Sequence, residues 1–183
     1  VHVGVDRLRH LDEIMPANVQ AIYSDPQTIR ERLHWADLIV GAVLVRGARA
    51  PHLIRREDLR HIRQGSVIVD VAIDQGGCVE TARMTTHGAP TFEVDGIVHY
   101  CVGNMPAAVA RTSTLALTNV TLPWTLKLAK YGPRKLAGMD HFFADAINTW
   151  HGRLTYRPVA EAHGMQYTPL DDAIRGTPAA ARG

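Results

Sequence analysis

The sequence has few cysteines and a net charge close to zero. The first argues against disulfide-rich and metal-binding proteins, and the second against nucleic-acid-binding proteins. It holds two cysteines in 183 residues, Cys78 and Cys101, and no C-x-x-C pair. This usage indicates a reducing compartment, so we expect a cytoplasmic protein with no disulfide framework and no metal site. The formal net charge is only +2, and the basic residues of 55–65 are interspersed with acids. We therefore expect a solvated helix face there and no nucleic-acid partner.

Several motifs are also missing. No apolar run reaches 18 residues, so we expect no membrane partner, and the first ten residues lack the apolar core of a signal peptide. The sequence contains no G-x-x-x-x-G-K-[ST], no G-x-S-x-G and no G-x-G-x-x-G. Phosphate-loop and serine-hydrolase chemistry therefore have no support. The ten histidines have no carboxylate partner at helical spacing, so we expect them at the surface or satisfied in the core.

What the sequence does contain is a series of short apolar runs separated by polar, helix-like stretches. The runs predict strands at 19–24, 37–45, 66–73 and 97–102. One helix is expected after Asp25 and Pro26, and another over 55–65. Strands and helices alternating in this way are typical of βαβ units. The fold class is therefore α/β, with a parallel sheet covered by helices.

The C-terminal part is predicted to be helical. A long helix is expected from near Pro106 to near Gly132, with a kink or break at Pro123. A second helix is expected at about 134–150, followed by an amphipathic piece at 158–165. The composition of the last residues indicates a disordered tail.

Polar residues follow two of the predicted strands at the point where each ends. Asp74 follows the run at 66–73, and Asn104 follows the run at 97–102. Because the carboxyl ends of parallel strands meet at one edge, we expect these residues to converge, together with the backbone at Val43 and Leu44. A partly desolvated Asp74 could act as an acid or base, and Asn104 with the following helix N-terminus could bind a polar headgroup. The alternative is a turn carboxylate and a helix cap.

Three segments carry a resemblance to a known family: "GAVLVRGARAP", "GSVIVDVAIDQGGCVETARMTTH" and "VDGIVHYCVGNMPAAVARTSTLALTN". They resemble the alanine dehydrogenases, relatives of the α subunit of proton-translocating transhydrogenase, and the likeness extends over about residues 5–132. The resemblance implies an incomplete Rossmann-type parallel sheet flanked by helices, plus C-terminal helices of the family's catalytic domain. The implied division is a partial NAD-binding domain at 1–118, a helical segment at 119–170 and a disordered tail at 171–183.

The same resemblance implies NAD-dependent oxidation of L-alanine to pyruvate and ammonia in a homo-oligomer, a hexamer in the family. Asp74 matches the catalytic aspartate, which assists proton transfer or positions a water. The residues that match cofactor contacts are Arg7 and Ser24 near the adenosine half, then Val43, Leu44, Val71, Ala72, Ile73, Asp74, Arg83, Val102, Gly103, Asn104 and Met105.

The sequence also departs from the family pattern. It has no equivalent of the glycine-rich loop or of the N-terminal half that supplies the substrate-carboxylate cations and a catalytic histidine. We therefore expect weak NAD binding at most and no turnover by this chain alone, unless another chain supplies that half. Met84 stands where the family has proline, and Gly103 where it has alanine. Two alternatives stay open: a transhydrogenase α-type subunit, and a non-catalytic fragment that binds a partner through an exposed sheet edge.

Overall fold

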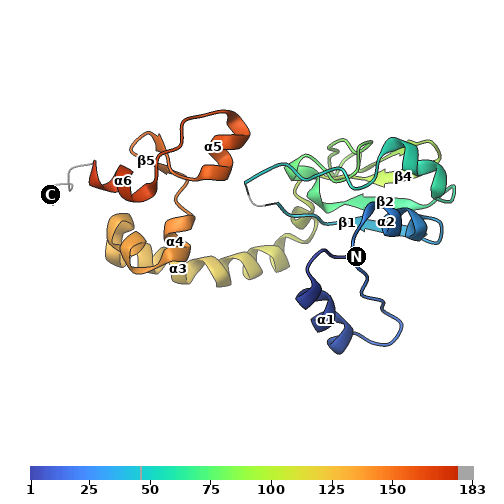
Figure 1. The fold of residues 1–183 in the computed structure, drawn as a ribbon, viewed down its shortest axis with the longest axis horizontal. Helices are drawn as coiled ribbons and strands as arrows, with labels where there is room; N and C mark the ends of the chain where they lie inside the picture. The colour runs from blue at the N-terminus through green and yellow to red at the C-terminus, as the bar shows by residue number, and fades with distance from the viewer. Residues whose placement is uncertain (46, 177–183) are drawn as a thin grey trace. The chain divides into compact units, whose positions relative to one another are not determined.

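The chain folds into two compact units, drawn in Figure 1. The computed structural model describes residues 1–45 and 47–176. The first unit comprises Val1–Leu44 and Ala50–Met105, and the second comprises Val45–Arg49 and the chain from Pro106 onward. The predicted domain boundary between residues 118 and 119 lies within a helix of the second unit, and the assignment of the parts to named domains stays a prediction. No helix in the described ranges is long and apolar enough to cross a membrane.

The first unit is built on a four-stranded sheet with the order β1-β2-β4-β3. Its strands are β1 (Leu38–Gly41), β2 (Val67–Asp70), β3 (Thr91–Val94) and β4 (Ile97–Tyr100). β1 and β4 both pair with β2 in parallel, which confirms the predicted parallel sheet. The central strands hold the core, where Ile68, Ile97 and Val79 are fully buried. β1 forms one end of this sheet.

Two strand predictions are wrong. The run at 19–24 forms only an isolated bridge between Tyr23 and His2. The antiparallel hairpin β3–β4 was missed, although Asp95 and Gly96 between the strands carry its signal. Both residues take positive φ, 52° and 78°, as a two-residue hairpin turn requires.

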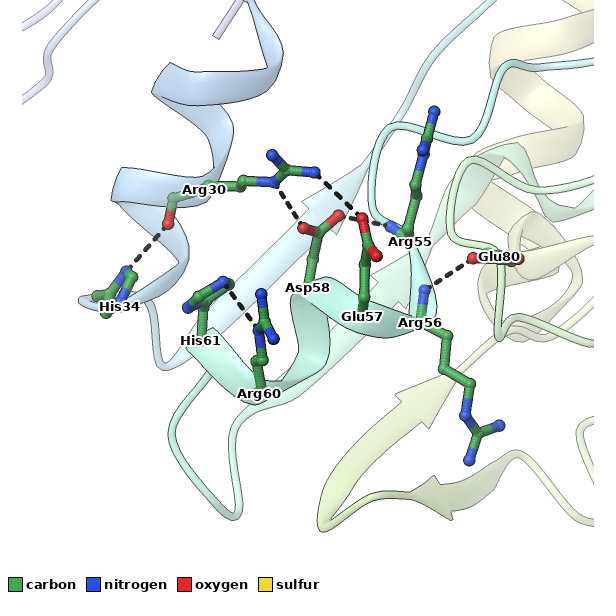
Figure 2. A network of polar contacts seen from close by, with 9 residues as sticks. All are labelled: Arg30, His34, Arg55, Arg56, Glu57, Asp58, Arg60, His61 and Glu80. Carbon is green, nitrogen blue, oxygen red and sulfur yellow. Dashed lines mark hydrogen bonds and ion pairs between the residues drawn. The ribbon is translucent and has the colours of Figure 1, made fainter.

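The first unit includes the helices α1 (Val5–Ile14) and α2 (Pro26–Leu33) and the 3₁₀ helix η1 (Arg56–His61). The cap at Asp25 is confirmed, because its Oδ1 accepts a hydrogen bond from the Thr28 N–H at 2.9 Å. The helix predicted over 55–65 is only this short 3₁₀ turn. A network of polar side-chain contacts stabilises this turn, which is too short to be stable through its own backbone hydrogen bonds (Figure 2).

That network centres on Asp58, whose residue is 4% exposed. Its Oδ1 accepts from Arg30 Nε at 2.7 Å, and its Oδ2 accepts from the Arg55 backbone N–H at 2.9 Å. Burial alone would raise the pKa of Asp58, but these two hydrogen bonds and the nearby charges of Arg30 and His61 together outweigh burial and lower it. The ion pair joins α2 to η1, since Arg30 lies on α2 (Figure 2).

The second unit is mostly helical. After the 3₁₀ turn η3 (Met105–Val109) it contains α3 (Ala110–Met139), α4 (His141–Asp145), β5 (Thr149–Trp150), β6 (Arg153–Leu154), α5 (Arg157–His163) and α6 (Leu170–Arg175). α3 breaks at Gly132, with φ 71° and ψ 162°, where the predicted long helix was expected to end, whereas its backbone stays helical at Pro123, where a kink or break was predicted. Glycine tolerates that φ because it has no Cβ, and Pro133 then suits the first turn of the next helical stretch.

The single helix predicted at 134–150 is also wrong. Asp140 ends α3 and caps α4 through hydrogen bonds from the N–H groups of Phe142 and Phe143. His151 and Gly152 then take positive φ and turn β5 back onto β6. The amphipathic piece at 158–165 falls largely in α5. α6 occupies residues where a disordered tail was expected, and the rest of that segment, 177–183, lies outside the described residues.

Candidate functional site

A buried carboxylate, not an exposed one, ends strand β2. Asp70 is 0% exposed and lies directly before the 3₁₀ helix η2 (Val71–Gln75). Its Oδ2 accepts hydrogen bonds from the backbone N–H groups of Cys78 at 2.9 Å and Val79 at 3.2 Å. Sequence reasoning missed Asp70, because it was taken as part of an apolar run. A charged residue inside such a run requires buried partners, and that was the available signal.

The predicted strand at 66–73 therefore ends three residues early, and η2 carries Asp74 instead. Ala72 and Ile73 are buried and anchor η2 on the core. The carbonyls of Ala72 and Ile73 accept from the N–H groups of Gly77 and Gly76 respectively, which closes the turn. Asp74 projects from this anchored turn and is exposed, so the predicted partial desolvation of its carboxylate is wrong in this structure.

Asp74 meets Asn104 as the strand-end argument predicted. The backbone N–H of Asn104 donates to Asp74 Oδ2 at 3.3 Å. The Asn104 carbonyl lies 3.3 Å from His87 Nε2, which can donate to it. The neighbouring Gly103 N–H donates to the Thr85 carbonyl at 3.1 Å. We call the contact between Asp74 and the Asn104 N–H the clasp.

The clasp holds an unusual backbone. Asn104 has φ 53°, in the left-handed region, which asparagine tolerates better than most residues. Because its main-chain groups are used in this way, the side-chain amide projects without a hydrogen-bond partner among the described residues. Asp74 Oδ1 is likewise without a partner in the described ranges. The clasp thus leaves one carboxylate oxygen of Asp74 and the side-chain amide of Asn104 available to a ligand.

The helix N-terminus expected beside Asn104 lies further along the chain. The turn η3 begins at Met105, and α3 begins only at Ala110. A five-residue 3₁₀ turn offers a smaller aligned dipole than a long α-helix. The site therefore depends on the side chains of the clasp rather than on helix α3.

Met84 and Gly103, the two positions that the resemblance marks as departures from the family pattern, are neighbours. A Cβ built on Gly103 would lie 3.0 Å from Met84 Sδ and 3.4 Å from Asp74 Oδ1. Met84 is 60% exposed and flexible, so it fills space beside Gly103 without being fixed there. The methionine and the glycine are therefore neighbours at the edge of the clasp.

The remaining predicted cofactor residues fall into groups of different exposure. Ala72, Ile73 and Val102 are buried, so only their backbone could face a ligand. Leu44 and Val71 are exposed, at 67% and 47%. Val43 packs against the core, and its backbone lies against the Cys78 thiol. These positions fit a cofactor surface made of backbone and two exposed apolar side chains.

The two predicted arginines do not join the clasp through any contact in the described ranges. The Arg83 guanidinium lies over the Phe92 ring, 4.3 Å from its centroid, and Phe92 stacks on the buried His99. Arg7 is exposed on α1. Ser24 lines a hollow of about 250 Å³ together with Asp25 and His52. That hollow is a separate feature of the first unit, and neither Asp74 nor Asn104 lines it.

The buried histidine His99 and both cysteines pack within the core. His99 is fully buried, its Nδ1 donating to the Ile97 carbonyl at 2.9 Å and its Nε2 accepting from Thr81 Oγ1 at 2.8 Å, as expected of a satisfied core histidine. Burial, then the nearby Asp70 charge, raises the pKa of Cys78 to about 12, and the same causes raise that of Cys101. Both cysteines therefore stay protonated thiols. No metal-binding group of three His, Cys, Asp or Glu occurs in residues 1–45 and 47–176.

Comparison with known proteins gives consistent matches over most of the chain. The family model described as "Alanine dehydrogenase/PNT, C-terminal domain" matches residues 1–157. An alanine dehydrogenase of Halomonas elongata is 53% identical over 171 residues, which are 93% of this chain and 46% of that protein. One from Bacillus subtilis is 46% identical over 176 residues, which are 96% of this chain and 47% of that protein.

A solved structure named L-alanine dehydrogenase matches the fold. It superposes with a TM-score of 0.76 at 45% identity, over 89% of this chain and 45% of that one. The chain thus spans about half the length of the curated relatives it matches.

Proposed function

The chain belongs to the alanine dehydrogenase/PNT C-terminal domain family, and from this premise we propose that its clasp is the cofactor-facing part of an NAD-dependent alanine dehydrogenase site. The observation that carries the proposal is the contact of the Asn104 N–H with Asp74 Oδ2. It joins two strand ends at the edge where open α/β sheets bind ligands. Relatives named alanine dehydrogenase cover nearly the whole chain.

The residues present fit NAD on two observations. The Asp74 oxygen and the Asn104 side-chain amide, which have no hydrogen-bond partner among the described residues, belong to two exposed residues that contact each other. The hollow at Ser24 offers hydroxyl and carboxylate groups to a ribose. When bound, NAD supplies the acceptor for the hydride of the alanine Cα. The residues that would hold it are Asn104, Met105, Leu44 and Val71 at one end and Ser24 at the other.

In this proposal Asp74 acts as the general base that accepts a proton from a water molecule. Its free Oδ1 is an exposed acceptor that can orient a water and receive its proton as alanine is converted to pyruvate and ammonia. Asn104 fixes the other oxygen of the same carboxylate, so the accepting oxygen has a defined direction. We propose a homo-oligomer in the cytoplasm as the working form, with alanine and pyruvate as the substrates.

NMR spectroscopy of the ¹⁵N-labelled 183-residue chain tests this function. Nicotinamide mononucleotide should shift the amides of Asn104 and Gly103, and AMP should shift that of Ser24. Asp74→Ala should reduce the first response and spare the second. Asp145→Ala, which removes an exposed carboxylate from α4, is the matched control. Shifts by neither ligand at these residues would contradict the proposal.

Turnover is a separate measurement. Because the sequence contains no G-x-G-x-x-G, the pyrophosphate lacks its usual backbone donors in this polypeptide, and we expect weak NAD binding and no NADH formation from alanine. NADH formation that Asp74→Ala abolishes would show that the expected inactivity is wrong. Hydride exchange between NADPH and an NAD analogue would favour the transhydrogenase alternative. The non-catalytic alternative predicts self-association through β1, and a monodisperse monomer in sedimentation would count against it.

A further inference from the structure

We propose that Asp70 is the positioning residue of the clasp: its buried carboxylate fixes η2, and through η2 it places Asp74 against Asn104. The resemblance and the strand-end argument both pointed to Asp74 alone. The structure adds a second carboxylate four residues earlier, fully buried at the end of β2. It makes no contact with the clasp itself, so it acts through the turn.

The first step is how Asp70 closes the turn. The N–H groups of Cys78 and Val79 donate to its Oδ2, and the Cys78 thiol lies 3.5 Å from its Oδ1. The segment from 71 to 77 therefore starts directly after Asp70 and ends directly before the residues that donate to its carboxylate. Two further bonds, Gly76 N–H to the Ile73 carbonyl and Gly77 N–H to the Ala72 carbonyl, brace the inside of the turn.

The second step is that the Asp70 carboxylate fits beneath the turn only because residue 77 is a glycine. A Cβ on Gly77 would lie 3.0 Å from Asp70 Oδ2, and the residue has φ 78°. A side chain there would be strained and would press on the carboxylate. The two glycines after Asp74 thus serve the fit of Asp70 beneath the turn.

The third step is the consequence for Asp74. No cation contacts Asp70 in the described ranges, so two backbone N–H groups and the Cys78 thiol hold the carboxylate. The backbone hydrogen bonds are directional and fix the backbone of 78–79 to within their geometry. With both ends of the turn fixed and Ala72 and Ile73 buried, the backbone of Asp74 is held where its Oδ2 lies 3.3 Å from the Asn104 N–H.

The test follows the Asn104 amide resonance of the ¹⁵N-labelled chain without cofactor or substrate. Asp74→Ala removes the acceptor and defines the resonance position of an open clasp. We expect Asp70→Ala, which removes the acceptor of the Cys78 and Val79 N–H groups, to move the Asn104 resonance to that same position. In the Asp74→Ala background, Asp70→Ala should move it no further, because Asp70 acts only through Asp74.

Two controls separate positioning from a general structural role. Ser66→Ala removes the other buried polar side chain of this strand region, at the opposite end of β2, and should leave the Asn104 resonance unchanged. The Ile68 and Val98 amides report the sheet and should keep their wild-type positions in Asp70→Ala. Gly77→Ala, which keeps the carboxylate but displaces the turn, should reproduce the Asn104 shift if Asp70→Ala does not fold.

An unchanged Asn104 resonance in Asp70→Ala or Gly77→Ala, or an equal further shift in the Asp74→Ala background, would overturn the inference. The inference rests on the proposed function only in giving Asp74 a catalytic role; the positioning of Asp74 by Asp70 is independent of it. Because the measurement uses neither NAD nor alanine, the clasp can pass this test while the nucleotide titration fails, or the reverse.

Discussion

Two buried carboxylates of the first unit are held in opposite ways. Asp58 lies between α2 and η1 and meets the Arg30 guanidinium, whose side chain is 40% exposed. Asp70 lies under η2 and accepts hydrogen bonds from two backbone N–H groups and from the Cys78 thiol. The first arrangement joins two elements through side chains that can move. The second fixes the main chain of a single turn, which suits a site that must place one oxygen.

The largest expected effect is that of Asp70→Ala. It leaves the N–H groups of Cys78 and Val79 buried without acceptors, which costs about 3 kcal/mol of the free energy of unfolding. Urea denaturation followed by circular dichroism measures this loss. A loss no greater than that of Ser66→Ala would mean that the buried amides find other acceptors.

Asp58→Asn should cost about half as much, roughly 1.5 kcal/mol, because the Arg55 N–H keeps an acceptor, while the bond to Arg30 is lost and the half-exposed guanidinium can be hydrated instead. The same urea titration measures it. If Asp58→Asn proves more damaging than Asp70→Ala, the ordering of the two carboxylates is reversed.

The pH dependence of Asp58 has a defined sign. Its folded pKa is lowered, so its contribution to stability is fully present above the unfolded value of about 3.9 and is lost as the pH falls through the folded pKa. Thermal melts between pH 6 and about pH 3 should show a smaller fall in Tm for Asp58→Asn than for the wild type. Parallel falls in both proteins would assign the acid sensitivity to other groups.

The smallest effect is expected at the edge of the clasp. Gly103→Ala places a Cβ 3.0 Å from Met84 Sδ, but that side chain can rotate away, so stability should change by less than about 0.5 kcal/mol. The Asn104 resonance should nevertheless shift, and Met84→Ala in the same chain should reverse part of that shift. A large loss of stability would show that Met84 is fixed despite its exposure.

The sequence predicted the parts of the fold that follow from local patterns. The apolar runs located β1, β2 and β4, and the Asp25–Pro26 pair located the start of α2. The ends of the strands were predicted too late, because Val71, Ala72 and Ile73 continue an apolar run while forming a 3₁₀ turn. Ala72 and Ile73 are apolar because they are buried in the 3₁₀ turn, and not because they belong to a strand.

The site was predicted in part for a similar reason. Topology alone brought Asp74 and Asn104 together, since parallel strands share one edge. The role of Asp70 depends on hydrogen bonds from residues eight and nine positions further along the chain. No periodicity or propensity encodes such a contact, and only the rule that buried charge needs partners would have marked the residue.

The hairpin at Asp95 and Gly96 also has a consequence for the order in which the sheet is assembled. Thr91 pairs with Tyr100 across a tight turn, whereas Val67 must find Val98, and Leu38 must find Val67, across long crossovers. Short loops close in microseconds, and closing longer ones costs more entropy. We expect β3 and β4 to form first and to template β2, with β1 the last strand to join and the first to leave.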